Sequence, residues 1–358
     1  MLSSISFAKD ISLDEAINLA IENNSSIISL NAEERQQERD YNSVKKDTRI
    51  WQNKQAYAFE TSSEYFLYTG DALEEAQLKY DLYLKSIESA KDSAEYNLIS
   101  TLYNLELAEK NIALLEKNVE LLEKQKLVYE LRHKLNMITQ LDLDNFLLSY
   151  NETKNTLDNA KAQYELGKEN IKIILGQTED INIVLPEIQT EELRIEDIDK
   201  FIDDNINNNK SLLELKYNYK ALENQYVGVK KGLYTEQYEM MYPNIKLQVK
   251  VLEDNYQALG AQLELTTNNM STLYKSYYNK IKTSELEIQT KANKLELDKK
   301  NFEIVKTRYD AGYIAELDYQ AAKLGVEKSE IDYKTSVINN MLLNTEFKMF
   351  VETGYMKV

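Results

Sequence analysis

The chain has 358 residues, a formal net charge of −17 at pH 7, no cysteine and one histidine. The acidic balance, with no basic patch to offset it, argues against nucleic acid as a partner. The absence of cysteine excludes disulfides, thiolate metal sites and cysteine nucleophiles. With only two prolines and nine glycines, the composition favours long helices over a compact mixed fold. No run of about eighteen apolar residues is present, so we expect no transmembrane helix.

The start of the chain combines an expected tail with a clear helix signal. We expect residues 1–11 to form an N-terminal tail, the remnant of a signal peptide, because a small-x-small triplet near its end resembles the close of a secretory signal. Ser12 and Glu15 have the spacing of a capping box, which predicts a helix from Leu13. A polar run that starts at Asn23 interrupts this helix.

Two aromatic-rich stretches, residues 49–70 and 233–253, interrupt the helical pattern. Neither sustains the alternation of apolar and polar residues that is typical of a strand. We interpret each as a bend between helices. Their aromatic side chains suit a membrane interface, where tryptophan and tyrosine are enriched, and they equally suit a sealed barrel end or a contact between subunits.

One candidate helix runs from Asp71 to Leu135 and carries two apolar stripes. The first stripe has the alternating three-four spacing of a coiled-coil seam; its residues are Leu105, Ala108, Ile112, Leu115, Val119 and Leu122. The second stripe repeats every seven residues, offset around the helix; its residues are Leu107, Leu114, Leu121 and Val128. Because two stripes require two neighbours, the helix belongs to a bundle or to the wall of a helical barrel.

Two short stretches match each other at one constant offset, Leu131–Leu143 and Thr307–Tyr319. Gly312 in the second aligns with Asn136 in the first, and these are the residue types that best tolerate a left-handed backbone. Long helical segments flank both stretches. Each stretch is therefore predicted to be the tip of a helical hairpin, and the chain is a duplication.

The duplication predicts how the chain is organised. We expect a first helical-hairpin repeat at 12–176, a linker at 177–194, a second repeat at 195–354 and a tail at 355–358. The linker holds the one short strand-like run, Ile181 to Pro186. The predicted fold class is all-α: duplicated long antiparallel helical hairpins that form an α-helical barrel, with little or no β-structure.

These features resemble the TolC-like outer-membrane efflux protein family. The resemblance is carried by the opening I-S-L-D-E-A-I-N-L-A-I-E-N-N, by the tip R-Y-D-A-G-Y-I-A-E-L-D, by the closing glycines and by the two-fold repeat. It implies a homotrimer whose tips face a membrane-fusion (adaptor) protein and an ABC or other inner-membrane transporter. The family inserts a β-hairpin at each bend. Here both bends are too short for two membrane strands, so we expect a variant without the transmembrane β-barrel.

The resemblance also implies roles for individual tip residues. Tyr309 resembles the tyrosine that helps to hold such tips closed, and Asp318 resembles the pore-lining aspartate, with Asp142 as its counterpart. Ala321 stands where a second acidic ring would be expected. An alternative role for Asp318 and Asp142 is to stabilise the start of a helix, because an acidic side chain in the first turn is favoured by the helix dipole. The adaptor-docking candidates, whose alternative role is simply to form the turn, are Asn136, Met137, Ile138, Gly312, Tyr313 and Ile314.

The resemblance therefore predicts an exported, extracytoplasmic conduit subunit of a tripartite efflux or type I secretion-like system in the cell envelope, not expected to span a membrane by itself. The alternative is a structural coiled-coil spacer protein that encloses no channel. A cytoplasmic bundle that senses or bends membranes is disfavoured, because such surfaces are usually basic. With His133 alone and no nucleophile or phosphate-binding motif, we expect no enzyme, catalytic residue, cofactor or metal site.

Overall fold

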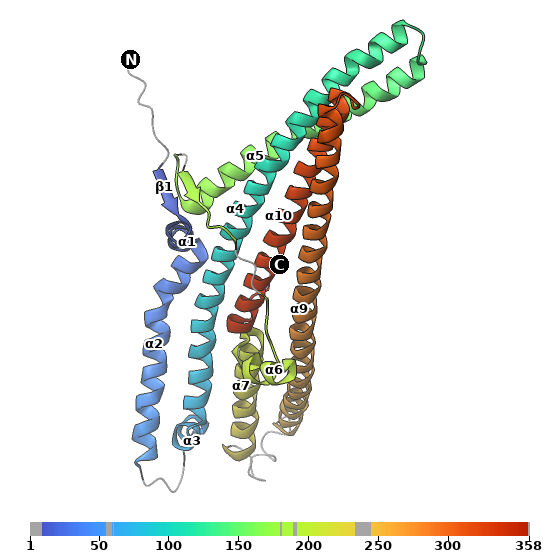
Figure 1. The fold of residues 1–358 in the computed structure, drawn as a ribbon. Helices are drawn as coiled ribbons and strands as arrows, with labels where there is room; N and C mark the ends of the chain where they lie inside the picture. The colour runs from blue at the N-terminus through green and yellow to red at the C-terminus, as the bar shows by residue number, and fades with distance from the viewer. Residues whose placement is uncertain are drawn as a thin grey trace, which may run out of the picture. The chain divides into compact units, whose positions relative to one another are not determined.

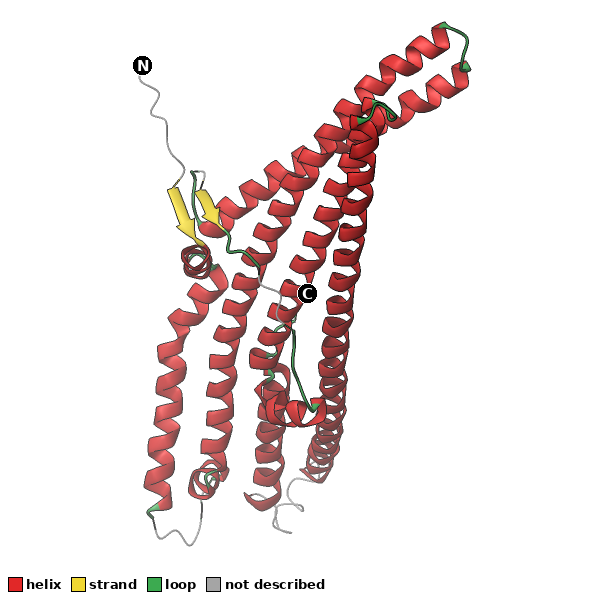
Figure 2. Ribbon diagram, viewed as in Figure 1, coloured by secondary structure: helices red, strands yellow, loops and turns green. Residues whose placement is uncertain are grey.

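The structure is a computed structural model. It describes residues 9–54, 59, 61–179, 181–188, 192–232 and 245–356. Across these residues, helices dominate and the one sheet has two short strands (Figure 2). The all-α prediction with little β-structure is confirmed.

The chain divides into two compact units, each built from both halves of the sequence. The first, the tip unit, comprises Met1–Asn23, Glu95–Leu193 and Lys280–Asn344. The second, the bend unit, comprises Asn24–Ala94, Arg194–Asn279 and Thr345–Val358. This division cuts across the predicted repeats, whose boundaries stay a prediction.

The first helix begins as its capping box predicts. In α1, Leu13–Glu22, the Ser12 hydroxyl accepts a hydrogen bond from the Glu15 amide at 3.2 Å, and the Glu15 carboxylate accepts one from the Ser12 amide at 2.9 Å. The predicted interruption is also present. The side chain of Asn24 caps the next helix, α2, Ser25–Gln52.

The strand-like run of the linker is confirmed as strand β2, Ile181–Val184. It pairs in parallel with β1, Lys9–Ser12, so that Ile11 lies opposite Ile183. Part of the segment expected to be a tail is thus a strand, because its backbone groups find partners far along the chain. Beneath the sheet lies a buried apolar cluster; its residues are Ile11, Ala16, Ala20, Leu98, Leu102 and Leu175.

Four long helices carry the hairpins: α4 (Asp71–Lys134), α5 (Gln140–Leu175), α9 (Ile245–Asp310) and α10 (Glu316–Thr353). The ends of α5 and α10 fall at glycines with positive φ, as predicted. Of the described helices, none is long and apolar enough to cross a membrane.

In the tip unit these helices lie side by side in the order α5, α4, α10, α9 (Figure 1). Ion pairs join each neighbouring pair. They are Lys161 to Glu116 at 2.6 Å, Lys117 to Glu327 at 2.8 Å and Lys299 to Glu330 at 2.9 Å. Two helices, α5 and α9, therefore stand at the two edges of this row.

The bend unit adds shorter elements: α3 (Ser62–Thr69), α6 (Ile198–Asn205), the 3-10 helix η1 (Ile206–Asn208) and α7 (Lys210–Gly232). The first aromatic bend is more helical than expected, since it contains the end of α2 and all of α3. In the second bend, residues 233–244 lie outside the described residues. Our expectations for the two bends therefore stay predictions.

An aromatic core holds the bend unit. Tyr274 is fully buried and its ring contacts those of Phe201, Phe347 and Phe350. Its hydroxyl donates a hydrogen bond to the carbonyl of Asn205 at 3.4 Å. Because burial disfavours the phenolate, it raises the pKa of Tyr274 to about 12.

Candidate functional site

Both predicted tips close with the same backbone geometry. Asn136 has φ 55° and Gly312 has φ 78°, so each occupies the left-handed region. In the first tip the amide of Met137 donates to the carbonyl of Arg132, and in the second the amide of Tyr313 donates to that of Arg308, each at 2.8 Å. This is the Schellman ending of a helix. The alignment of the two tips is thus confirmed at the level of individual hydrogen bonds.

The outermost side chains of the tips are apolar and exposed. Met137 is 68% exposed and Tyr313 is 84% exposed, whereas Ile138 and Ile314 are half-buried. Of the six candidate docking residues, the two isoleucines thus belong partly to the hairpin, and Met137 and Tyr313 are the large side chains most open to a partner.

The two tip aspartates differ in their surroundings. Asp142 completes a capping box with Thr139: its carboxylate accepts from the Thr139 amide at 2.9 Å, and its own amide donates to the Thr139 hydroxyl at 3.1 Å. The carboxylate also accepts a hydrogen bond from the Thr139 hydroxyl at 2.7 Å. This bond, followed by the one from the Thr139 amide, lowers the pKa of Asp142. In the second tip the counterpart of Thr139 is Ala315, whose methyl side chain cannot form a cap. Asp318 is exposed, and its side chain makes no hydrogen bond or ion pair with any described residue.

Tyr309 connects the two helices of the second tip. Its hydroxyl donates a hydrogen bond to the carboxylate of Glu316, and its ring stacks on that of Tyr319 with centroids 4.5 Å apart. The hydrogen bond from Tyr309 lowers the pKa of Glu316, with a smaller effect from Gln320. The tip motif indicated Tyr309 but not Glu316, which accepts its hydrogen bond. The available signal was an acid in the first turn after a tip, which the helix dipole alone would explain.

The second apolar stripe of the long helices distinguishes the two hairpins. On α4, Leu107 and Leu121 are buried, and Leu121 faces α10 across a small cavity. On α9 the matching stripe ends with Leu297 and Ile304, which are 58% and 55% exposed. The apolar stripe is therefore covered by a neighbouring helix on α4, whereas the matching residues on α9 are exposed.

The other edge helix, α5, is also open. Its exposed apolar residues are spaced by seven, eighteen and seven residues, which places them on one face of the helix; they are Leu141, Leu148, Leu166 and Ile173. The tip unit thus ends in two different uncovered apolar edges, one on α9 and one on α5. The two stripes of α4 predicted two neighbours for that helix, but which stripe of the chain lacks a neighbour depends on the order of the helices in space.

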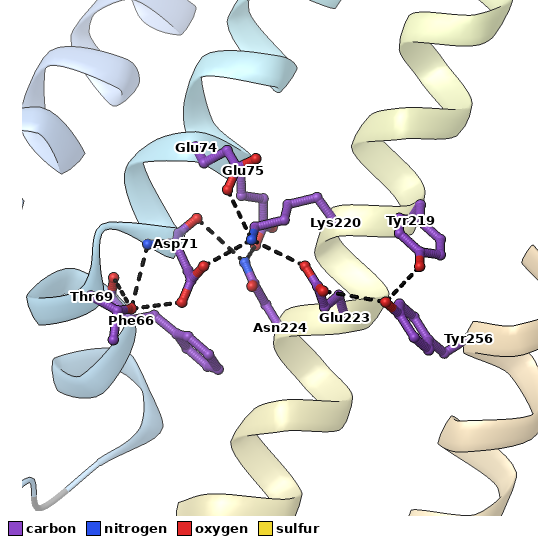
Figure 3. A network of polar contacts seen from close by, with 10 residues as sticks. All are labelled: Phe66, Thr69, Asp71, Glu74, Glu75, Tyr219, Lys220, Glu223, Asn224 and Tyr256. Carbon is purple, nitrogen blue, oxygen red and sulfur yellow. Dashed lines mark hydrogen bonds and ion pairs between the residues drawn. The ribbon is translucent and has the colours of Figure 1, made fainter. Parts of the chain in front are cut away.

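In the bend unit, a largely buried lysine stands at the centre of a polar network that the sequence did not indicate (Figure 3). Lys220 of α7 is 12% exposed and its ammonium lies 2.8 Å from Asp71, 2.9 Å from Glu74 and 3.1 Å from Glu223. Burial by itself would lower the pKa of Lys220, but the three carboxylates outweigh burial and raise it. Only Glu223, one turn away, could have been found from local spacing.

The network continues on both sides of Lys220 (Figure 3). The Asn224 amide donates to Glu75 at 2.7 Å. The hydroxyl of Tyr256 on α9 donates a hydrogen bond to the carboxylate of Glu223 at 3.2 Å. The same hydroxyl accepts a hydrogen bond from the Tyr219 hydroxyl at 2.5 Å. The hydrogen bond with Tyr219, followed by burial, raises the pKa of Tyr256. The network ties α4, α7 and α9 together, and we assign it a structural role.

Comparison with known proteins defines the class of fold. No protein-family model matches the sequence, and no curated protein matches it either. Solved structures do match: the CmeC outer membrane channel of Campylobacter jejuni aligns with a TM-score of 0.66 at 12% identity, over 96% of this chain and 86% of that chain. The outer membrane protein VceC of Vibrio cholerae aligns with a TM-score of 0.63 at 11% identity, over 96% of both chains.

A membrane protein of Pseudomonas aeruginosa aligns with a TM-score of 0.61 at 12% identity, over 98% of this chain and 92% of that chain. Of these matched structures, CmeC and VceC are outer-membrane channels of the TolC family. The chain is therefore TolC-like in fold, as the sequence resemblance implied. At such low identities the likeness establishes the fold, and function has to be argued from the chain itself.

Proposed function

We propose that three copies of this chain form an α-helical conduit in the cell envelope, outside the cytoplasm. The observation that carries the proposal is the pair of uncovered apolar edges on α9 and α5. Because the two edges differ, association joins α9 of one copy to α5 of the next, and a head-to-tail contact of this kind closes into a ring when the rotation permits. The number three comes from the TolC-like fold.

The tips support a docking role for the same assembly. They present exposed apolar side chains, Met137 and Tyr313, where a chain that needed only to turn would be expected to carry polar residues. We infer that they bind a membrane-fusion protein that works with an ABC or other inner-membrane transporter, in efflux or in type I-like secretion. Asp318, exposed beside the second tip, is the candidate for a ring of carboxylates at a constriction, and Tyr309 for a closing contact. Asp142 is less suited to a constriction because Thr139 engages its carboxylate.

Light scattering on the purified chain tests the ring directly. A conduit is expected to give a mass near three times 41.7 kDa, followed by a central hole in electron micrographs. A clean monomer at micromolar concentration would instead favour the spacer alternative, a coiled-coil protein without a channel.

Cross-linking tests the order of the ring. The chain lacks cysteine, so Leu148→Cys on α5 and Leu297→Cys on α9 introduce unique thiols. In the duplication Leu297 matches Leu121 of α4 and Leu148 matches Leu324 of α10. Because Leu121 and Leu324 line one cavity, we expect the two thiols to lie at similar heights. A short bis-maleimide is expected to link the double variant into dimers and trimers and to leave each single variant unlinked. Dimers from a single variant would contradict head-to-tail association.

A tip variant separates docking from assembly. Tyr313→Glu places a charge on the exposed tip, and we expect it to abolish transport in cells while the oligomeric mass stays unchanged. Glu287→Gln, a change at an exposed side chain of α9 away from the tip, is the control. Normal transport by the Tyr313→Glu variant would contradict docking through this tip.

A further inference from the structure

A cavity of about 380 Å³ lies in the tip unit between α4, α5 and strand β2. Its size is that of sites that hold small molecules. Most of its lining is aliphatic; these residues are Leu102, Leu105, Ile171, Leu175, Ile181, Ile183 and Leu185. Several of them also pack on the buried cluster beneath the sheet. The floor of the cavity is therefore continuous with the core and preformed.

Polar side chains line the remaining part of the cavity, and two of them are lysines of α5. Lys168 and Lys172 lie one turn apart on the face that borders the cavity. Each is engaged by the glutamate three residues before it: Lys168 pairs with Glu165 at 3.0 Å, and Lys172 pairs with Glu169 at 2.8 Å. The positive charge at this edge is thus already compensated by the chain.

The two acids of the polar edge come from α4 and differ in their partners. Glu106 pairs with Lys334 of α10. Glu109, one turn further on, is exposed and has neither an ion pair nor a hydrogen bond within the described residues. Tyr164 stands across from it. Burial, and then the charge of Glu109, raises the pKa of Tyr164, so its hydroxyl stays neutral.

We propose that this cavity binds a cationic amphiphile, whose apolar body lies on the aliphatic floor and whose positive head lies beside Glu109. Burial of the apolar body supplies the affinity, at about 25 cal/mol per Å² removed from water. The unpaired carboxylate of Glu109 supplies the preference for a positive head, since the other charges of the lining already have partners. The site is independent of the proposed conduit, because every residue that forms it belongs to one copy of the chain.

Three probes with the same tail and different heads test the proposal: decyltrimethylammonium, decanoate and decyl maltoside, each below its micelle concentration. Calorimetric titration of the intact chain at pH 7 and low salt is expected to rank the cation tightest and decanoate weakest. The advantage of the cation is expected to shrink as salt is added, because an exposed charge pair is screened. Equal affinity for the three probes, tighter binding of decanoate or no binding of the cation would overturn the proposal.

Two variants and a control locate the site. Ile183→Trp is expected to fill the cavity and abolish binding of all three probes, with folding checked by circular dichroism. Glu109→Gln is expected to weaken decyltrimethylammonium by about three- to fivefold, as for an exposed ion pair, and to leave decyl maltoside unchanged. Glu287→Gln removes another exposed carboxylate, away from the cavity, and should change nothing. Cation binding unaltered by Glu109→Gln would overturn the assignment, and this outcome remains readable even if Ile183→Trp fails to fold.

Discussion

Tyr309 and Glu316, seven residues apart, are joined by a hydrogen bond that connects the last turn of α9 to the first turn of α10. The bond links the two helices directly across the second tip. It also favours the charged form of Glu316 and lowers the pKa of that residue. A lowered pKa stabilises the folded state fully at pH values above the ordinary pKa of a glutamate. The contribution of Glu316 to stability is therefore lost as the pH falls through its lowered pKa.

Tyr309→Phe is therefore expected to return the pKa of Glu316 toward its ordinary value and to make the tip amides exchange faster. Titration followed by NMR measures the first effect, and hydrogen exchange measures the second. Tyr313→Phe, which removes a hydroxyl from an exposed tip residue, serves as the control. An unchanged Glu316 titration in Tyr309→Phe would show that the hydrogen bond is not populated in solution.

The exposed stripe on α9 makes a prediction about assembly. Leu297→Glu places a charge on the apolar edge that we propose to be covered by α5 of the next copy. We expect the oligomer to dissociate into monomers with unchanged helix content, since Leu297 is already 58% exposed in one copy. Gln289→Glu adds the same charge to the same helix about 80° around its axis and should leave the mass unchanged. Light scattering and circular dichroism check both outcomes.

The largely buried Lys220 of the bend unit makes a prediction about stability. Lys220→Met leaves a group of carboxylates without their cation, and we expect it to lower the free energy of unfolding by about 2 kcal/mol. The value is below that for a fully buried pair because Asp71 and Glu223 are about one-third exposed. Asp71→Asn should cost less, since two other carboxylates still hold Lys220. Urea unfolding measures the free energy of unfolding of both variants. A larger loss for Asp71→Asn than for Lys220→Met would contradict the interpretation that three carboxylates share the charge of Lys220.

Two glycines of the second hairpin should respond in opposite ways to alanine. At Gly312, φ is 78°, so Gly312→Ala is expected to destabilise the chain by about 1 kcal/mol through backbone strain, although nothing lies near the added methyl group. At Gly325, within α10, the methyl group also meets open space and the backbone is helical. Gly325→Ala is therefore expected to stabilise by about 0.5–1 kcal/mol. Thermal unfolding distinguishes the two signs.

The buried hydroxyl of Tyr274 predicts a dependence on alkaline pH. Burial raises its pKa to about 12, so below the ordinary tyrosine value of about 10 its contribution is constant. Above that value the unfolded chain ionises first and stability falls. Relative to Tyr274→Phe, the wild type is expected to lose about 1 kcal/mol by pH 11. Parallel unfolding curves from pH 9 to 11 check this, and a constant difference would contradict a buried neutral hydroxyl.

Local chemistry along the chain was enough to place the hairpin tips and several helix ends. Ser12 and Glu15 predicted the start of α1, and the left-handed residues Asn136 and Gly312 predicted the two turns. The stripes of α4 predicted two neighbours. The capping and turn signals depend on residues within one or two turns of each other, so these local interactions can be predicted from the sequence alone.

Only the tertiary structure decided which distant groups meet. Strand β1 exists because β2, far along the chain, satisfies its backbone hydrogen bonds. Lys220 gains Asp71 and Glu74 because α7 packs beside the start of α4. Likewise, the matched stripe residues Leu121 of α4 and Leu297 of α9 differ in exposure because α10 covers only the first of them. Periodicity tells which faces of a helix are apolar, but the order of the helices in space determines which of those faces are buried and which remain open to a partner.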